Sequence, residues 1–332
     1  MRRRKRRIRY WPIVLIVAAI ALAGASLFQP YAGFQGDVLI EFPKGTTSAE
    51  MGQRLAKAGV VRYAWQFLLV RIFRPTARLQ AGEYRFGKPA SAWEVFRRIV
   101  RGDVVYYELV VPEGYNLFEI AQALEEIKLM PAQRFLQAAR NPSLVADIAP
   151  RAPTLEGYLF PSTYHVPKKA TADQICKQMT AQFRKVWSEL QAPEGTDVHA
   201  VVTLASMVEK ETAIADERPL VASVYANRLR LGMKLDCDPT AAYAAILEGH
   251  YRGAVLKADL ERDHPYNTYK VGGLPPGPIA NPGRASLEAA LRPAQTKFLY
   301  FVAKPDGSGK HVFSTDISAH HRAVAQYRRG RR

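Results

Sequence analysis

The segment Val201-Val-Thr-Leu-Ala-Ser-Met-Val-Glu-Lys-Glu-Thr212 carries the strongest structural signal in this chain. Four of its apolar residues follow the i, i+3, i+4, i+7 spacing that places side chains on one helical face: Val201, Leu204, Ala205 and Val208. The spacing predicts a helix over 198–212 with one buried apolar stripe. Two acidic residues, Glu209 and Glu211, stand at the carboxyl end of this helix.

The two acids differ in their angle to the apolar stripe. At about 100° per residue, Glu211 falls roughly 60° from the centre of the stripe, and Glu209 falls about 100° away on the other side. Glu211 should therefore lean into the interior, where burial and the carboxyl end of the helix dipole both raise the pKa of a carboxyl group. We expect Glu211 to be a proton donor and Glu209 to be solvated, although such a pair alone is common on ordinary helix surfaces.

Three further segments carry groups that suit a sugar, which offers apolar ring faces and polar edges. Asp238-Pro239-Thr240 is typical of a helix start, with Asp238 as the N-cap and Pro at the first helical position. Tyr266-Asn-Thr-Tyr269 sets two aromatic faces beside amide and hydroxyl groups. Leu155-Glu-Gly-Tyr-Leu-Phe-Pro161 combines aromatic rings with an acid. Capping and packing would explain each segment as well.

The chain of 332 residues has a formal net charge of +17, which is concentrated at its ends. Seven positive charges lie in Arg2–Arg9 and four in Arg328–Arg332, so the interior is only mildly basic. Residues 11–28 carry no charge, and a helix of that length reaches roughly 27 Å, enough to cross a bilayer core. We expect a cytoplasmic basic tail over 1–10, a transmembrane anchor over 11–28 and no nucleic-acid partner. A cleaved signal peptide is the alternative, and either way residues 37–332 are exported.

The exported part begins with an internal repeat. Phe42-Pro43-Lys-Gly45 is followed by Met51 and Leu55, and Val111-Pro112-Glu-Gly114 is followed at the same offsets by Ile120 and Leu124. Each copy predicts a strand, a turn and a short amphipathic helix. Between the copies we expect helices near 63–73 and 92–101 and an extended segment over 81–86.

A proline-rich stretch over 149–153 predicts a domain boundary near residue 150. Beyond it the apolar spacing predicts a mainly helical region, with helices near 171–190, 198–212, 215–231, 239–248 and 316–328 and a hairpin formed by 298–303 and 311–314. The expected fold class is α+β.

Several kinds of chemistry find no support in the sequence. There is no phosphate-binding loop, no Ser-x-x-Lys or Gly-x-Ser-x-Gly nucleophile motif and no His-Glu-x-x-His zinc motif. His320 and His321 are adjacent and cannot share one helical face, and two cysteines are too few for a cysteine-rich metal module. We expect no metal and no cofactor. Cys176 and Cys237 either pair outside the cytoplasm or remain structural thiols.

From about residue 40 to 328 the sequence resembles the endolytic murein transglycosylases of the MltG (YceG-like) family. The resemblance is carried by seven ordered motifs: Leu155-Glu-Gly-Tyr-Leu-Phe-Pro161, Ala205-Ser-Met-Val-Glu-Lys-Glu-Thr212, Val221-Ala-Ser-Val-Tyr-Ala-Asn-Arg-Leu229, Asp238-Pro-Thr240, Tyr266-Asn-Thr-Tyr269, Gly273-Leu-Pro-Pro-Gly277 and Tyr300-Phe-Val302. One departure is Asp236 and Cys237, which stand where relatives usually carry uncharged polar residues.

The resemblance implies a single-pass protein of the bacterial inner membrane, with its amino terminus in the cytoplasm and its catalytic part outside. It implies a LysM-like glycan-binding region over 37–150 and a catalytic transglycosylase domain over 151–328. The implied reaction cleaves the MurNAc-GlcNAc β-1,4 bond of nascent peptidoglycan strands, leaves a 1,6-anhydroMurNAc end and limits strand elongation. Cell-wall synthases such as penicillin-binding proteins are the expected protein partners.

The family's catalytic glutamate is the second acid of the Glu-Lys-Glu motif, which falls on Glu211 and agrees with the helical-face argument. We expect seven residues to hold the distorted sugar and the departing strand: Glu156, Asn227, Asp238, Thr240, Tyr266, Asn267 and Tyr269. Two alternatives stay open. One is a hydrolase that pairs Glu211 with a second carboxylate from Glu156, Glu209 or Asp238. The other is a non-catalytic, membrane-anchored scaffold that binds peptidoglycan.

Overall fold

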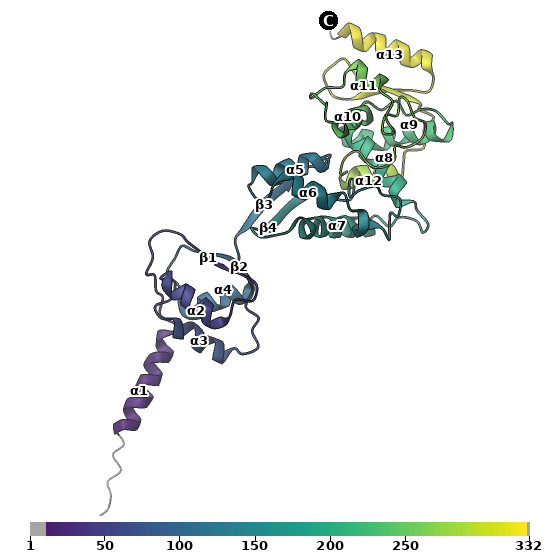
Figure 1. The fold of residues 1–332 in the computed structure, drawn as a ribbon. Coiled ribbons are helices and arrows are strands. Elements are labelled where there is room, and N and C mark those ends of the chain that lie inside the picture. Colours follow the sequence, from purple (N-terminus) through teal and green to yellow (C-terminus); the bar gives the residue numbers. More distant parts are fainter. Residues whose placement is uncertain (1–10, 331–332) are drawn as a thin grey trace, which may run out of the picture. The chain divides into compact units, whose positions relative to one another are not determined.

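The computed structural model describes residues 11–330, so the expected basic tail over 1–10 lies outside the described residues. The chain forms two compact units, which are drawn in Figure 1. The first extends to Tyr107 and includes Val166–Lys169, and the second contains Glu108–His165 and the chain from Ala170 onward. The mixture of helices and short antiparallel strand pairs confirms the α+β class.

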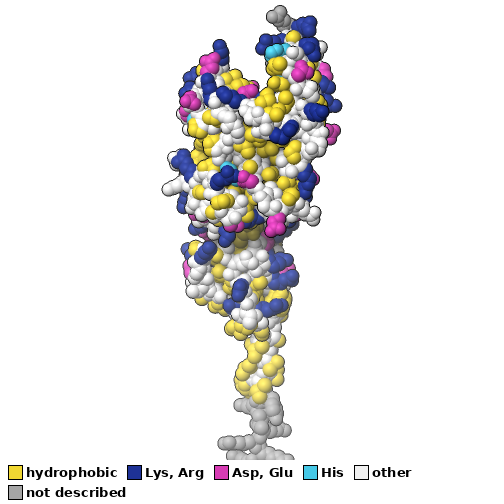
Figure 2. All heavy atoms as spheres, turned by 90° about the vertical axis from the view of Figure 1, so that its right-hand side faces the viewer, with side chains coloured by type: hydrophobic (Ala, Val, Ile, Leu, Met, Phe, Trp, Pro, Cys, Tyr) yellow, Lys and Arg dark blue, Asp and Glu magenta, His cyan; other side chains and the backbone are white. Residues whose placement is uncertain are grey.

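The amino-terminal helix α1 (Trp11–Ser26) has 16 residues, none of them buried, and Figure 2 shows it covered with hydrophobic side chains. It is shorter than the expected span over 11–28, because the helix ends at Ser26 and the next two residues pack against the first unit. Leu27 is buried in the core of the first unit, and Phe28 packs on Trp93 with ring centroids 5.6 Å apart. Among residues 11–330, no helix has both the length and the apolar character needed to cross a membrane.

The first unit pairs β1 (Val38–Phe42) with β2 (Gly82–Phe86) in antiparallel register, so that Val38 faces Phe86 and Phe42 faces Gly82. Alternate strand residues are buried, which lets the sheet cover a core formed with α2 (Ser48–Lys57), α3 (Ala64–Phe73) and α4 (Ala92–Arg101). Ser91 and Glu94 form a capping box that starts α4, and Gly102 ends it in the left-handed conformation. These elements confirm the helices and the extended segment expected between the repeat copies.

The second unit starts within β3 (Tyr106–Val111), which pairs with β4 (Ser162–Pro167). The helices α5 (Leu117–Glu126) and α6 (Ala132–Ala139) and the 3₁₀ turn η1 (Pro142–Val145) lie between the two strands in sequence. Both copies of the repeat form a strand, a turn and a helix, and each turn has a glycine at positive φ, 86° at Gly45 and 80° at Gly114. The chain divides into its two compact units after Tyr107, so the two copies lie in different units. The sequence analysis placed a domain boundary near residue 150.

The physical reason for the earlier division is the way residues 108–150 pack. The backbone N–H of Leu117 donates to Glu156 Oε2 at 2.9 Å, and the N–H of Leu155 donates to the carbonyl of Ala139 at 2.8 Å. These bonds tie α5 and α6 to the loop that follows residue 150. The proline-rich stretch is therefore an internal turn of the second unit.

The remainder of the second unit is mainly helical. Its elements are α7 (Ala172–Glu189), α8 (Val198–Glu211), η2 (Ala215–Glu217), α9 (Arg218–Arg230), α10 (Asp238–Leu247), α11 (Lys257–Glu261), α12 (Arg284–Leu291), β5 (Tyr300–Ala303), β6 (His311–Ser314) and α13 (Ile317–Gly330). The expected helices and the carboxyl-terminal hairpin are confirmed, whereas α6, α11 and α12 were not expected. Helix α8 packs against α9, α10 and α12, so it is the central element of this unit.

Candidate active site

Glu211 ends α8 and reaches the wall of a cavity of about 580 Å³. Its Oε1 accepts a hydrogen bond from Tyr225 Oη at 2.8 Å, and the Cys237 thiol also hydrogen-bonds the carboxyl group. Burial raises the pKa of the Glu211 carboxyl, and the hydrogen bonds from Tyr225 and Cys237 lower it by less. The environment therefore favours the protonated form, as the helical-face argument predicted.

The neighbouring acid Glu209 is not solvated, and the expectation of an exposed side chain was wrong. Its side chain is only 6% exposed and forms an ion pair with Arg218 at 3.2 Å. Its Oε2 also accepts the backbone N–H of Gly283 at 2.8 Å. Arg218 lies nine residues along the chain and Gly283 much further, so the helix pattern alone could not reveal these partners.

Tyr225 and Cys237 are the two partners of Glu211 that sequence reasoning missed. Tyr225 projects from α9 and is 1% exposed, and Cys237 immediately precedes α10 and is fully buried. Burial raises the pKa of the Tyr225 hydroxyl and of the Cys237 thiol, so both stay protonated and donate. Cys237 and Cys176 are free and buried, so the expected disulfide alternative is not formed.

The cavity combines the end of α8 with walls from α9, α10, the β5–β6 hairpin and α13. Its lining residues are Glu211, Tyr225, Arg228, Leu235, Asp236, Asp238, Tyr269, Tyr300, Phe301, Val302, Ala303, His311, Ile317, His320, His321, Val324 and Arg328. Figure 2 shows this end of the second unit as a notch, with hydrophobic side chains along its walls. Of the predicted site residues, Glu211, Asp238 and Tyr269 line it.

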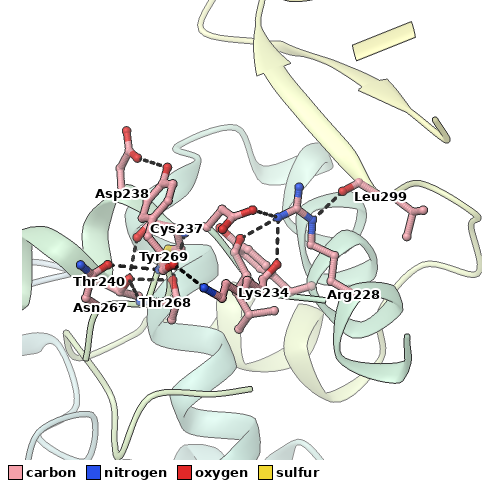
Figure 3. Close-up of polar contacts among 12 residues, drawn as sticks. Arg228, Lys234, Cys237, Asp238, Thr240, Asn267, Thr268, Tyr269 and Leu299 are labelled. Carbon is pink, nitrogen blue, oxygen red and sulfur yellow. Dashed lines mark hydrogen bonds and ion pairs between the residues drawn. The ribbon is translucent and has the colours of Figure 1, made fainter. Parts of the chain in front are cut away.

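Asp238 and Tyr269 are joined by a hydrogen bond from Tyr269 Oη to Asp238 Oδ1 at 2.5 Å (Figure 3). Lys234 Nζ donates to the Tyr269 carbonyl at 3.0 Å and holds the same loop. Asp238 was expected to be the N-cap of α10, but it is the first helical residue and Cys237 is the cap. The Asp238 carboxylate is therefore available to the cavity.

Thr240 and Asn267 support the cavity wall without lining the cavity. Thr240 Oγ1 donates to the Cys237 carbonyl at 2.6 Å and contacts Thr268 Oγ1 at 2.8 Å, and both threonines are fully buried (Figure 3). Asn267 is also fully buried, and its Nδ2 donates to three backbone carbonyls in 259–262. These side chains fix the loop that presents Tyr269.

Asn227 and Arg228, at the carboxyl end of α9, hold the strand hairpin. Asn227 Nδ2 donates to the carbonyls of Thr296 and Phe298, each at 3.0 Å. Arg228 Nε donates to the Leu299 carbonyl at 2.7 Å (Figure 3), and its guanidinium lies over the Tyr300 ring, 5.0 Å from the centroid. Arg228 lines the cavity, whereas Asn227 acts behind its wall.

Glu156 and Tyr266 do not line the cavity: Glu156 lies in the interior of the second unit, and Tyr266 is half-buried. Glu156 is 1% exposed and accepts hydrogen bonds from the Leu117 N–H, Tyr243 Oη and Asn281 Nδ2, at 2.9, 2.9 and 3.0 Å. Burial raises its pKa to about 8. Tyr266 packs on Tyr243 with ring centroids 5.1 Å apart. Both residues connect buried segments.

The described residues contain no group of three or more His, Cys, Asp or Glu side chains arranged to hold a metal ion. The side chains at the cavity offer one carboxyl group whose pKa is raised by burial, with hydroxyl, imidazole and aromatic groups around it.

This chain belongs to the YceG-like family, whose model matches residues 40–326. It is 32% identical over 333 residues to an endolytic murein transglycosylase of Bacillus subtilis, covering 94% of this chain and 91% of the relative. It is 29% identical over 322 residues to an endolytic murein transglycosylase of Streptococcus pneumoniae, covering 87% of this chain. In that second comparison the chain spans 58% of the relative's length.

A crystal structure of a yceG-like protein from Listeria monocytogenes is similar over 87% of this chain and 99% of the other, with a TM-score of 0.55 and 32% sequence identity. The similarity therefore extends through both compact units described above.

Proposed function

We propose that this chain is an endolytic murein transglycosylase that cleaves the MurNAc-GlcNAc β-1,4 bond within nascent peptidoglycan strands and leaves a 1,6-anhydroMurNAc end. The observation that carries the proposal is the position of the Glu211 carboxyl on the wall of the cavity, where burial raises its pKa. The relatives from Bacillus and Streptococcus are named as endolytic murein transglycosylases, which supports the same reaction.

In the proposed mechanism, Glu211 acts first as acid and then as base. Its proton passes to the glycosidic oxygen as the bond from that oxygen to the muramic-acid C1 breaks, so the leaving sugar departs as an alcohol. The ionised carboxylate then takes the proton of the C6 hydroxyl, whose oxygen attacks C1 and closes the anhydro ring. An intramolecular hydroxyl has a high effective concentration, so the step needs no positioned water.

Asp238 and Tyr269 are the residues that we place against the sugar, because they line the cavity with Glu211. Asn227, Thr240 and Asn267 position the walls through the bonds described above, and Tyr266 and Glu156 support the interior behind them. Substrate recognition then depends on a small exposed set of side chains held by a buried polar scaffold.

The hydrolase alternative needs a second carboxylate that can activate water or attack the sugar. Glu209 is held by Arg218 and Glu156 lies in the interior, which leaves Asp238 as the candidate among the three acids considered. The masses of the products decide between the reactions, because an anhydro end lacks one water relative to a reducing end.

The decisive experiment incubates the full-length protein, in detergent, with uncrosslinked glycan strands, followed by mass spectrometry. Anhydro-ended fragments of internal cleavage are the expected products. Reducing ends would establish the hydrolase. Retention of the protein on murein without any turnover would establish the scaffold.

The amino-terminal part has separate proposed roles. Helix α1 tethers the protein to the inner membrane through its exposed apolar side chains, with the basic tail on the cytoplasmic side and both compact units outside. The region over 37–150 contributes LysM-like glycan binding and brings the enzyme to strands made by penicillin-binding proteins. Membrane fractionation of cells, with and without replacement of the apolar residues of α1 by serine, tests the tether.

A further inference from the structure

A histidine–glutamate pair, His311 and Glu217, lies at the cavity but has no part in the mechanism above. His311 opens β6, and Glu217 ends η2. The Glu217 carboxylate contacts His311 twice: Oε1 accepts its backbone N–H at 3.0 Å, and Oε2 lies 2.7 Å from ring Nδ1. The side chains are 11% and 10% exposed, so both partners are held in one geometry.

The pair is connected to Glu211 by packed aromatic rings. The His311 imidazole meets the Phe301 ring edge-to-face, at 5.4 Å and 86°, and Phe301 meets Tyr225 in the same way, at 6.0 Å and 86°. Tyr225 donates its hydroxyl to Glu211. His311 and Glu211 line one cavity.

The contact with Glu217 occupies Nδ1 of His311 and leaves Nε2 as the ring nitrogen open to a ligand. A carboxylate bound at Nδ1 keeps the proton of the neutral imidazole on that nitrogen and leaves a lone pair on Nε2. Within residues 11–330, Nε2 has no hydrogen-bond partner. The pair therefore presents an oriented hydrogen-bond acceptor to the space in which Glu211 acts.

We propose that His311 is a catalytic residue whose Nε2 accepts a hydrogen bond from a hydroxyl of the bound strand other than the one that attacks C1, and that Glu217 is the positioning residue that fixes the ring. The inference rests on the proposed transglycosylase function and adds a second side chain to it. Glu211 remains the group that exchanges protons with the glycosidic oxygen and the attacking hydroxyl, and His311 holds the strand so that these atoms stay aligned.

The kinetic test uses full-length protein and uncrosslinked glycan strands. Because alignment of a reacting group affects the chemical step, His311→Ala should lower kcat about 100-fold and change KM less than about threefold. Glu217→Gln should lower kcat about tenfold in the wild-type background and cause no further loss in the His311→Ala background. If Glu217→Gln lowers kcat as much in the His311→Ala background as in the wild-type background, the positioning role of Glu217 is overturned.

His250 provides a matched control in the same unit. It forms a similar hydrogen bond with the buried Asp259, at 3.2 Å, and does not line the cavity. His250→Ala should reduce the midpoint of thermal unfolding as much as His311→Ala does, and leave kcat unchanged. Equal losses of kcat in the two variants would assign a purely structural role to His311.

A binding measurement separates this inference from the function on which it rests. In the inactive Glu211→Gln variant, chitotetraose should shift the imidazole NMR signals of His311 and leave those of His250 in place. Two results would refute the role of His311 and leave the transglycosylase standing. One is a His311→Ala variant that cleaves strands with the kcat of wild type. The other is a His311 signal that does not shift at saturating chitotetraose. Absence of cleavage by wild type refutes the transglycosylase, and the NMR titration still decides whether His311 contacts sugar.

Discussion

At the scale of single residues, the candidate site depends on how one carboxyl group is kept protonated. Glu211 accepts hydrogen bonds from two neutral donors, Tyr225 Oη and the Cys237 thiol. These bonds offset only part of the free-energy cost of burying its negative charge. This arrangement suits a group that must give up a proton and then recover it, because neither form is held too firmly.

Glu211→Gln should lower the rate of strand cleavage about a thousandfold, because the amide keeps the shape of the side chain and has no acidic proton. Product masses from a time course provide the measurement. Glu261→Gln, at an exposed ion pair with Lys257, is the control and should keep the wild-type rate. Anhydro products formed by Glu211→Gln at the wild-type rate would remove Glu211 from the mechanism.

Tyr225→Phe removes a hydrogen bond that lowers the pKa of Glu211, so that pKa should rise. The active form is the protonated acid, which is lost as the pH rises through its pKa. The alkaline limb of the kcat profile should therefore move to higher pH in the variant, and a pH–rate series measures it. A limb that stays in place or moves to lower pH contradicts the role of Tyr225.

Glu156→Gln distinguishes an interior connector from a substrate contact. The new amide nitrogen would face a donor, either Asn281 Nδ2 or the pair formed by the Leu117 N–H and Tyr243 Oη, so we expect a loss of about 2 kcal/mol in the free energy of unfolding. Urea unfolding measures the loss, and KM below the unfolding transition should not change. A raised KM with unchanged stability would return Glu156 to the substrate-binding set.

At the scale of elements, the walls of the cavity are presented by loops and strands that buried polar side chains hold in place. Asn267 alone donates to three carbonyls of 259–262, and Asn227 donates to two carbonyls before β5. The cavity is thus built from segments whose positions depend on few side chains.

Asn267→Ala should lower the free energy of unfolding by about 2 kcal/mol and raise KM, because three buried carbonyls lose their donor and the Tyr269 loop loosens. Thermal unfolding and steady-state kinetics check the two effects. Asn141→Ala, at the exposed start of η1, is the matched control and should change neither KM nor kcat. Unchanged KM in Asn267→Ala would mean that the loop does not hold the substrate.

The elements show which parts of the fold a sequence can predict. The long helices α7, α8 and α9 follow from apolar spacing, and Glu211 follows from the angle of one side chain on α8. The helices α6 and α12 have only eight residues each, too few for a periodic pattern to stand out. Tyr225 comes from another element and contacts Glu211 through tertiary packing, and His311 reaches the same cavity in the same way. No local pattern encodes such packing.

At the scale of the whole molecule, the two units have different roles in the proposed function. The carboxylate and its partners all belong to the second unit, whereas the first contains the amino-terminal strand pair and helices. Glycan retention and glycan cleavage should therefore be separable. Glu211→Gln should bind insoluble murein as well as wild type does, as measured by sedimentation, and a loss of binding in this variant would place retention in the cavity.

The short segment Val166–Lys169 belongs to the first unit although residues on both sides of it belong to the second. Lys168 and Lys169 form ion pairs there with Glu83 and Glu41. No single cut in the chain can therefore release the first unit intact. An engineer who transplants the first unit must therefore carry the second unit along or rebuild the missing piece.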